Sequence, residues 1–188
     1  MNKVRKFPQF ETERLILREL TLDDVEFYFH HFNNKEIVEG SCFPGPKDIE
    51  TAKAELELFC INPFREGTGI RWGIVRKSNS ELIGTCGYYD WNKTSRRVEI
   101  GYDLAPAYWG QGIMKEALRG VLEYGFQEMG LNRIQAIIDS KNKRSINLAQ
   151  KLGFKKEGVL RQRSYFRGRF LDDVCFSILR KEWGKPFR

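Results

Sequence analysis

The sequence predicts an α+β fold with a central mixed, mostly antiparallel, twisted sheet flanked by helices. Three consecutive segments between residues 70 and 105 alternate apolar and polar residues with a period of two, which indicates a strand meander. Helical spacing of apolar residues occurs both before and after that meander. The resulting order, β-α-α-β-β-β-α-β-α-β-β, neither alternates strictly nor consists of strands alone, so a doubly wound or an all-β architecture is disfavoured.

The N-terminal third is expected to contain one strand and two helices. The segment "RLILR" (14–18) predicts a short strand, and Thr21 is placed to cap a helix that runs to about residue 33. The Gly- and Pro-rich stretch 40–48 is expected to be a loop. A second helix follows, with an apolar face at spacings of three and four formed by Ile49, Ala52, Leu56 and Phe59.

The remaining elements are read in the same way. A wide apolar stripe at helical spacing begins at Ile113, and Gly130 is a plausible end for that helix. Gly153 closes a second, shorter helix, "KRSINLAQKLGF". The strands are expected at 70–77, 81–91, 96–105 and 133–139, followed by two strands around an Arg-Gly turn near the end of the chain.

Length and composition are those of an ordinary globular protein. The 188 residues, 41% of them hydrophobic, predict one domain, which we place at residues 10–182. No apolar run is long enough for a membrane span and the N-terminus has no apolar signal core, so a cytoplasmic location is expected. The net charge of +7 favours an anionic partner, although a merely solvated basic surface gives the same figure.

Neither metal nor cysteine chemistry is expected. The four cysteines form no CxxC pair, and His30 and His31 are helical neighbours that do not share a face. Cys86 and Cys175 have no adjacent base or helix start that would activate a thiol. We therefore expect buried structural thiols and no metal.

The stretch "YWGQGIMKEA" (108–117) carries the strongest functional signal. Gly110 and Gly112 stand directly before a helix, whose first amides lack partners and carry the positive end of the helix dipole. Such an arrangement can cradle a phosphate, but a tight turn would also use glycine. The P-loop requires Lys-Ser or Lys-Thr after its last glycine, and the dinucleotide fingerprint requires a third glycine where Lys115 stands, so both are excluded.

Two longer segments complete the pattern: "VEIGYDLAPAYWGQGIMKEAL" and "GLNRIQAIIDSKNKRSINLAQKLGFKKEGVLR". Together with the order of elements, they resemble the GCN5-related N-acetyltransferase (GNAT) superfamily over residues 10–182. More narrowly, they resemble the branch that acetylates the N-termini of ribosomal proteins. The resemblance implies an acetyl-CoA-dependent N-acetyltransferase with the GNAT fold.

The resemblance implies that backbone amides of the loop from Ala107 to Gly112 bind the pyrophosphate of acetyl-CoA. Ala107 stands where the family often has Gln or Arg, which removes one side-chain contact. Lys151 could reach the adenosine phosphates, although an exposed helical lysine is commoner. The implied cofactor-binding residues are Ile100, Tyr102, Leu104, Trp109, Gly110, Gln111, Gly112, Ile113, Met114, Asn142 and Ser145.

Acetyl transfer to an amine requires a proton acceptor, and Glu99 is the carboxylate of the core meander that matches this need. The alternative for Glu99 is an exposed charge that alternates with inward Val98 and Ile100. By resemblance, Asn142 hydrogen-bonds the pantetheine and Ser145 is a candidate acid for the departing thiolate. Ser145 could equally be a helix cap. No covalent acetyl-enzyme is required, so direct transfer in a ternary complex is expected.

The acceptor is expected to be a protein N-terminus, with ribosome contact possible and a homodimer common for this fold. Related branches acetylate polyamines, aminoglycosides and aminoacyl-type toxins, and the acceptor wall would include Phe32, Glu36, Glu39 and Phe43. A different class, an RNA- or ribosome-binding module, rests on a basic hairpin in which Arg161, Arg163, Arg167 and Arg169 could share one face near Tyr165 and Phe166. A degenerate fold that senses acyl-CoA is a third possibility.

Overall fold

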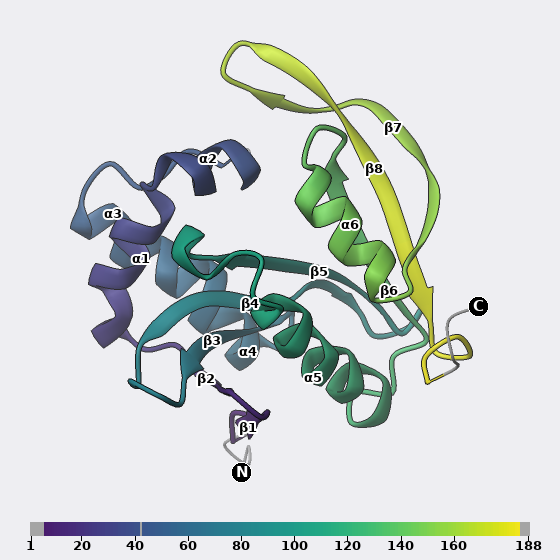
Figure 1. Cartoon of the computed structure of the whole chain (residues 1–188), viewed down its shortest axis with the longest axis horizontal. Helices are drawn as coiled ribbons and strands as arrows, with labels where there is room; N and C mark the ends of the chain where they lie inside the picture. Colours follow the sequence, from purple (N-terminus) through teal and green to yellow (C-terminus); the bar gives the residue numbers. More distant parts are fainter. Residues whose placement is uncertain (1–5, 42, 185–188) are drawn as a thin grey trace.

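The computed structural model describes residues 6–41 and 43–184 and is organised around one eight-stranded sheet. The strand order is β1-β2-β3-β4-β5-β6-β8-β7, and every neighbouring pair is antiparallel except β5 and β6. Figure 1 shows helices on both faces of this sheet, with the β7–β8 hairpin extending beyond it. The predicted α+β class is confirmed.

The N-terminal part supplies two short strands and four helices, together with one 3-10 and one π turn. The strands are β1 (Phe10–Glu11), which was not expected, and β2 (Leu15–Glu19). The helical elements are η1 (Leu22–Asp24), α1 (Val25–Phe32), α2 (Lys35–Ser41), α3 (Ile49–Leu56), the π turn η2 (Glu57–Ile61) and α4 (Asn62–Glu66).

Two expectations for this region are wrong. Residues 40 and 41 belong to the helix α2, because Ile37 and Val38 give that segment an apolar side to bury. Phe59 does not continue the apolar face of α3 and is 47% exposed. The π turn inserts one extra residue into the helical repeat, so Cys60, only 3% exposed, takes the buried position instead.

The meander and the elements after it lie close to their expected positions. They are β3 (Ile70–Arg76), β4 (Leu82–Asn92), β5 (Arg97–Leu104), the 3-10 turn η3 (Pro106–Tyr108), α5 (Ile113–Gln127), β6 (Arg133–Asp139), α6 (Lys143–Lys151), β7 (Lys155–Phe166) and β8 (Arg169–Leu179). The expected strands at 70–77, 81–91, 96–105 and 133–139 differ from the observed ones by no more than a residue at either end.

The sheet separates two apolar cores. The larger one packs α5 and α6 against the sheet and includes Trp72, Ile100, Leu118, Phe126 and Phe176. The smaller one lies among α1, α2, α3 and the π turn, where Tyr28, Phe32 and Leu56 meet Leu20. Each face of the sheet is thus held by its own set of helices. Within the described ranges, no helix is long and apolar enough to cross a membrane.

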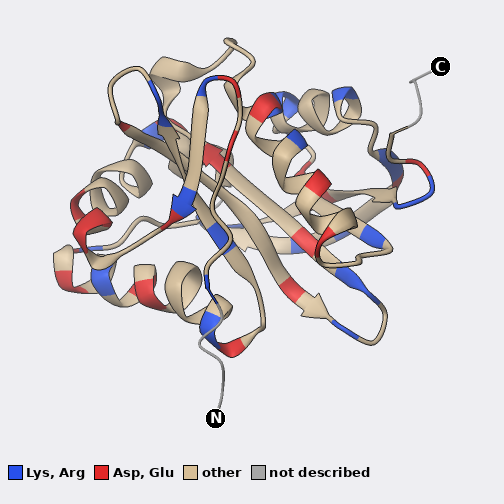
Figure 2. Cartoon of the chain, turned by 90° about the horizontal axis from the view of Figure 1, so that it is seen from below, with Lys and Arg blue, Asp and Glu red and all other residues tan. Residues whose placement is uncertain are grey.

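A few charged residues lie inside the sheet instead of on its rim. Figure 2 shows acidic segments within the strands; Glu99 and Asp173 are buried, and the side chain of Asp103 is 7% exposed. Asp103 is fixed by Arg71, whose Nη2 lies 2.5 Å from Oδ2, and by His31, whose Nε2 lies 2.7 Å from Oδ1. This cluster ties α1 to the strands β3, β4 and β5.

Candidate active site

The loop between β5 and α5 presents bare backbone at the start of the longest helix. Gly110 and Gly112 both have φ of +76°, a left-handed conformation that side chains rarely adopt. A Cβ atom at Gly110 would meet nothing within 4 Å, and one at Gly112 would meet only Arg14 Nη2 at 3.7 Å. The turn therefore needs glycine for its conformation and also leaves open space in front of the helix.

The amides of this loop are available as donors. Gly112 is the N-cap of α5 and caps it with no side chain. Among the described residues, no backbone carbonyl accepts a hydrogen bond from the amides of Gly110, Gln111 or Gly112. The first amides of α5, from Ile113 and Met114, have no partner within the helix either. An anion at this point would meet several converging N–H groups and the positive end of the helix dipole.

The turn between β1 and β2 holds the loop and the first turn of α5 in place. Arg14 Nε lies 2.6 Å from Glu116 Oε2 in the first turn of α5, and Arg14 Nη1 donates to the carbonyl of Gln111 over 3.1 Å. Thr12 Oγ1 donates to the other oxygen of Glu116 over 2.6 Å. The side chain of Gln111 donates to the carbonyl of Ala107 over 2.9 Å, so it stabilises the loop from within. The sequence did not point to Arg14.

Strands β5 and β6 diverge and leave an opening in the sheet. Their parallel pairing runs only from Arg97 with Arg133 to Glu99 with Gln135, although β5 continues to Leu104 and β6 to Asp139. Beyond Glu99, the edge of β5 that faces β6 has no strand partner within the described range. Such an edge offers free amide and carbonyl groups to an extended ligand. The Gly110–Gly112 loop lies at the far end of this edge.

Glu99 stands where the two strands part. One carboxylate oxygen accepts a hydrogen bond from Tyr89 Oη over 2.6 Å and the other from Gln135 Nε2 over 3.1 Å. The residue is 6% exposed, so its reading as an exposed surface charge is wrong. Burial, and next the nearby Glu99, raises the pKa of Tyr89, which keeps that hydroxyl protonated as a donor. Tyr89 itself is half exposed and faces solvent beside Glu99.

The three predicted cofactor-binding residues of β5 differ in which of their atoms face the opening. Ile100 and Leu104 are buried in the larger core, so only their backbone faces the opening. Tyr102 reaches across to α6 and donates from its hydroxyl to the carbonyl of Ser145 over 3.4 Å. Burial raises the pKa of Tyr102 to about 12. Ile113 and Met114 are buried too, and contribute backbone amides in the same way.

At the start of α6, the cap is Asn142 and not Ser145. Asn142 Oδ1 accepts from the backbone amide of Ser145 over 3.1 Å, and its Nδ2 donates to the carbonyl of Gly40 over 2.9 Å. The reading of Ser145 as the cap is therefore wrong, since that residue lies three positions inside the cap. The Asn142 amide also joins α6 to the end of α2 across the opening.

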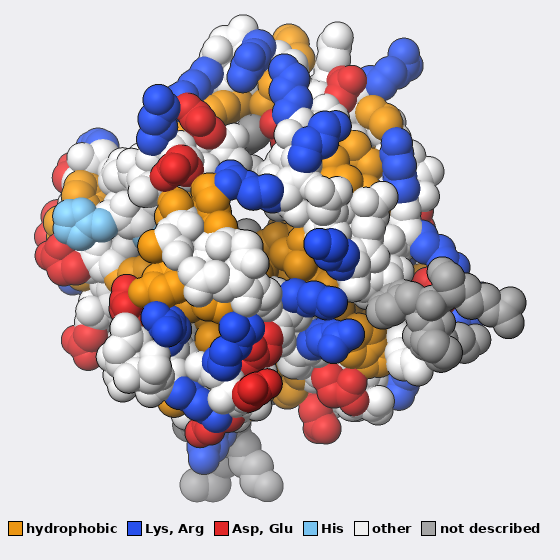
Figure 3. Space-filling model, viewed as in Figure 1, with side chains coloured by type: hydrophobic (Ala, Val, Ile, Leu, Met, Phe, Trp, Pro, Cys, Tyr) orange, Lys and Arg blue, Asp and Glu red, His pale blue; other side chains and the backbone are white. Residues whose placement is uncertain are grey.

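A contact between Trp109 and Arg144 joins the loop after β5 to α6. The indole Nε1 donates to the carbonyl of Leu104 over 2.7 Å, which fixes the ring at the end of β5. The Arg144 guanidinium lies 3.3 Å from the centre of the same ring, a close cation–π contact. Neither partner of Trp109 was predicted. Figure 3 shows a narrow opening in the middle of this face, with Lys and Arg side chains around it.

A groove of about 590 Å³ lies between α1–α2 and the tip of the β7–β8 hairpin. Helix α2 forms one wall of it and also contacts β5. The groove is lined by Asn33, Lys35, Val38, Pro44, Gly45, Tyr165, Phe166 and Arg167. Glu36 and Glu39, expected on the acceptor wall, are exposed on α2 but do not line the groove. Phe32 is buried beneath it and contacts Phe43.

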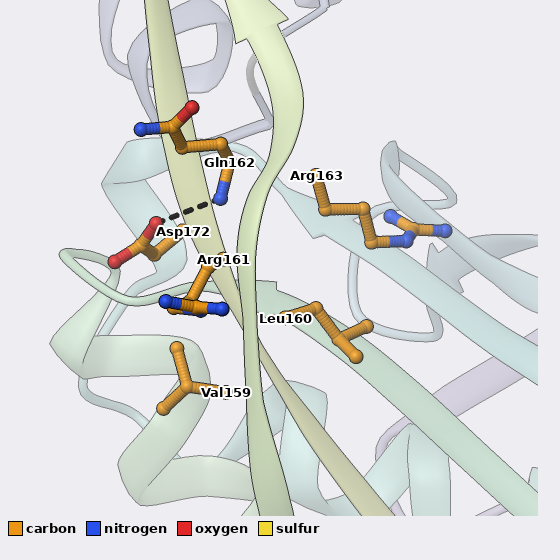
Figure 4. A pocket seen from close by; sticks show the side chains of 6 residues that line it. All are labelled: Val159, Leu160, Arg161, Gln162, Arg163 and Asp172. Carbon is orange, nitrogen blue, oxygen red and sulfur yellow. Dashed lines mark hydrogen bonds between the residues drawn. The ribbon is translucent and has the colours of Figure 1, made fainter.

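The hairpin arginines do not form the single stripe that the sequence suggested. A bulge places Arg161, Gln162 and Arg163 opposite Asp172, with Gln162 at a φ of +52°. The Gln162 amide donates to Asp172 Oδ1 over 2.8 Å, and Figure 4 shows Arg161 and Arg163 pointing to opposite sides of the strand. The bulge interrupts the period of two, so the expected alignment is wrong. A shallow cavity of about 960 Å³ lies at this bend.

The cysteines and histidines lie away from this arrangement. Cys60 and Cys86 are buried and Cys175 is half buried, and burial raises the pKa of each thiol, to about 12 for Cys60. Cys42 lies outside the described residues. His31 is buried against Asp103, while His30 is exposed. In the described part of the chain, no group of three His, Cys, Asp or Glu side chains could hold a metal ion.

Comparison with known proteins agrees with this geometry. The acetyltransferase (GNAT) domain model matches residues 14–155, so the chain belongs to the GNAT family. It is 41% identical to the uncharacterized N-acetyltransferase YoaA of Bacillus subtilis (strain 168), over 93% of this chain and 98% of that protein. The chain is accordingly an N-acetyltransferase.

Two further relatives differ in their named acceptors. The spermidine N(1)-acetyltransferase of Escherichia coli (strain K12) is 26% identical over 89% of this chain and 87% of its own length. The ribosomal-protein-S5-alanine acetyltransferase of Vibrio fischeri has a solved structure with a TM-score of 0.80 and 25% identity, over 95% of this chain and 100% of that one. The family is thus shown, and the acceptor is a separate question.

Proposed function

We propose that this chain transfers the acetyl group of acetyl-CoA directly to the N-terminal α-amine of a protein. The observation that carries the proposal is the opening between β5 and β6, which has a glycine loop with free amides at one end and the buried Glu99 at the other. A donor lying along β5 would present its reactive end to an amine that enters from the groove. Both substrates would then meet in one ternary complex.

The residues present fit acetyl-CoA. The amides from Gly110 to Met114 suit a pyrophosphate, because they converge at the positive end of α5 and no side chain blocks them. The unpaired edge of β5 from Ile100 to Leu104 suits the amide groups of pantetheine. When bound, acetyl-CoA would supply an activated thioester, and the protein would supply binding, orientation and proton transfer.

Glu99 is proposed as the proton acceptor. An amine attacks only as the neutral form, so the ammonium must lose a proton as it enters, and a carboxylate can take it directly or through water. Attack of the amine nitrogen on the thioester carbon forms the amide and breaks the carbon–sulfur bond. The departing thiolate then needs a proton, for which the Ser145 hydroxyl is the proposed donor. Asn142 is bound to Gly40 and to the helix start, so we propose that it orients this end of α6.

A protein N-terminus is favoured over a polyamine by the lining of the groove. Its two charged side chains, Lys35 and Arg167, are both cationic, and a polyamine would be repelled by them. Tyr165, Phe166 and Pro44 offer apolar surface for the side chains of a peptide. The groove is also open along its length, which suits an extended segment.

The first test is calorimetric titration with acetyl-CoA, with NAD and ATP as controls, followed by acetylation assays. The assays would use peptides with N-terminal Ala or Ser beside spermidine and an aminoglycoside. We expect binding of acetyl-CoA alone and transfer to the peptides. Transfer only to a small amine would replace the proposed acceptor. RNA affinity that falls with salt, without any turnover, would instead favour a binding module.

A further inference from the structure

The groove between α2 and the hairpin tip carries unbalanced positive charge. Among the described residues, no carboxylate forms an ion pair with Lys35 or with Arg167, which line the groove from α2 and from the hairpin tip. Arg167 instead lies 5.2 Å from the centre of the Phe166 ring. Two cations without a counter-charge at the mouth of a substrate groove raise the local concentration of anions.

The neighbouring acids do not cancel this charge. On the hairpin, Asp173 is buried and accepts from Ser164 Oγ over 2.6 Å and from Arg163 over 3.2 Å. Asp172 accepts from the backbone of Gln162. On α2, Glu36 and Glu39 are exposed but lie outside the groove lining. The acids near the groove are therefore either occupied or directed elsewhere.

The start of α6 adds to the same positive region. Lys143 and Arg144 occupy its first two positions, where the positive end of the helix dipole disfavours cations. Lys141 precedes the Asn142 cap, and the backbone of Ser140 is bonded to Asp172 of the hairpin over 2.9 Å. Lys143 Nζ donates to the carbonyl of Ser140 over 3.2 Å, while Arg144 lies over the Trp109 ring beyond the end of β5. Figure 3 shows Lys and Arg side chains from the upper rim of this face down to the opening.

We infer that the acceptor is an acidic peptide: a protein N-terminus whose α-amine is followed, within its first residues, by Asp or Glu side chains. The amine would reach Glu99, while the carboxylates would lie against Lys35 and Arg167. The aromatic rings of Tyr165 and Phe166 would contact the peptide chain between them. This inference rests on the proposed function, because it names the acceptor class of the same site.

The test compares peptides of equal length that share an N-terminal Ala. After that Ala, one carries Asp and Glu, a second carries Asn and Gln, and a third carries Lys; spermidine is the small-amine comparison. We expect kcat/KM for the acidic peptide to exceed that for the neutral one by at least about tenfold at low salt. The preference should shrink as ionic strength rises from about 0.05 to about 0.3 M.

Charge reversal in the groove assigns the effect to its residues. The double variant Lys35→Glu/Arg167→Glu should lose the preference for the acidic peptide and gain activity on the lysine peptide. Both side chains are exposed, so circular dichroism should show an unchanged fold, and affinity for acetyl-CoA should stay the same. The double variant Arg180→Glu/Lys181→Glu makes an equal change of charge at two exposed residues beyond the end of β8, so it is the matched control and should leave the preference intact.

The possible results distinguish failure of the acidic-acceptor inference from failure of the proposed N-terminal acetylation. Equal turnover of the three peptides would overturn the acidic acceptor and leave N-terminal acetylation standing. A preference for spermidine, or for a small amine that carries a phosphate, would overturn both. Acetyl-CoA binding without transfer to any peptide or small amine would refute the proposed function itself.

Discussion

At the residue scale, Glu99 combines burial with two hydrogen-bond donors and an opening beside it. Tyr89 and Gln135 each hold one carboxylate oxygen, which fixes the group at the point where β5 and β6 part. Tyr89 is half exposed, so the carboxylate is one side chain away from the solvent on the acceptor face. This geometry suits a proton acceptor that must be kept in position.

Glu99→Gln should lower kcat by roughly 10²–10⁴-fold, the usual contribution of general acid–base catalysis. The amide is the same size and can still accept from Tyr89, so affinity for acetyl-CoA should be unchanged. Steady-state kinetics at saturating donor, together with calorimetry, would check both statements. Unchanged kcat would remove Glu99 as the base. Reduced affinity for acetyl-CoA would mean that Glu99 shapes the cofactor site.

Gly112→Asp should abolish measurable binding of acetyl-CoA. The carboxylate would place negative charge in front of the amides proposed to hold the pyrophosphate, and φ of +76° adds strain for any side chain. Gly130→Asp is the matched control, since Gly130 also has a positive φ of +64° and open space around its Cβ position. Gly130 lies beyond the other end of α5, so the Gly130→Asp variant should still bind acetyl-CoA. Normal affinity in Gly112→Asp would contradict the anion site.

At the element scale, a buried ionic cluster holds α1 onto the sheet. Asp103 of β5 is in contact with His31 of α1, Arg71 of β3 and Thr85 of β4. All of these groups are buried or nearly so, and the carboxylate is the only negative charge among them. Since α1 leads into α2, the same cluster also positions one wall of the acceptor groove.

Asp103→Asn should destabilise the protein by about 3–5 kcal/mol, because it leaves Arg71 as an uncompensated buried charge. Urea denaturation followed by circular dichroism would measure the change in the free energy of unfolding. The exposed Asp90→Asn, which loses only a surface pair with Arg97, is the comparison and should cost no more than about 1 kcal/mol. A similar small cost in Asp103→Asn would show that the cluster is not a structural support.

At the scale of the whole molecule, carboxyl groups with a strongly lowered pKa determine how stability depends on pH at the acid end. The nearby charges and hydrogen bonds of His31, Arg71 and Thr85 outweigh burial and hold the pKa of Asp103 at about 2. In β7, hydrogen bonds from Arg133 and Ser177 hold the pKa of Glu157 at about 2. In the unfolded chain both carboxyls have a pKa of about 4, which is roughly two units higher than in the folded protein.

Stability should therefore fall as the pH drops from about 5 to about 2. The unfolded state takes up protons on these carboxyls first, so the stabilisation is complete above the unfolded pKa and is lost as pH approaches the folded value. Urea midpoints measured across this range would follow the loss. Glu157→Gln should flatten the pH dependence, whereas Lys53→Gln, an exposed change that removes no carboxyl, should leave it unchanged. A flat profile in the unaltered protein would contradict the linkage.

The sequence predicted most strands and helices well, but it was less accurate about where the N-terminal helices begin and end and which of their residues are buried. Alternation and spacing located the meander and α5, because burial of one face fixes those patterns, and the Arg-Gly turn located the hairpin. The helix α2 was partly assigned to a loop, since Gly40 and the prolines after it suggest a turn locally. The π turn could not be foreseen either, because Phe59 fits a regular helical face equally well.

The candidate site was located from the sequence only in part. The glycine loop was visible, since the residues lie together in the chain and no side chain was needed to recognise it. The partners Tyr89, Gln135, Arg14 and Arg144 carried no local signal, because each contacts the site from a different element. The competition between Asn142 and Ser145 for the helix cap likewise needed backbone positions.

By itself, the sequence determined the α+β class, the order of the strands and helices from β3 onward, and the glycine loop before α5. These features depend on periodicity and on backbone freedom, which are properties of neighbouring residues. Only the tertiary structure decided that Glu99 is buried, that β5 separates from β6 beyond it, and that Lys35 and Arg167 line one groove. Those features depend on strand register and on contacts between residues far apart in the chain, which no local pattern encodes.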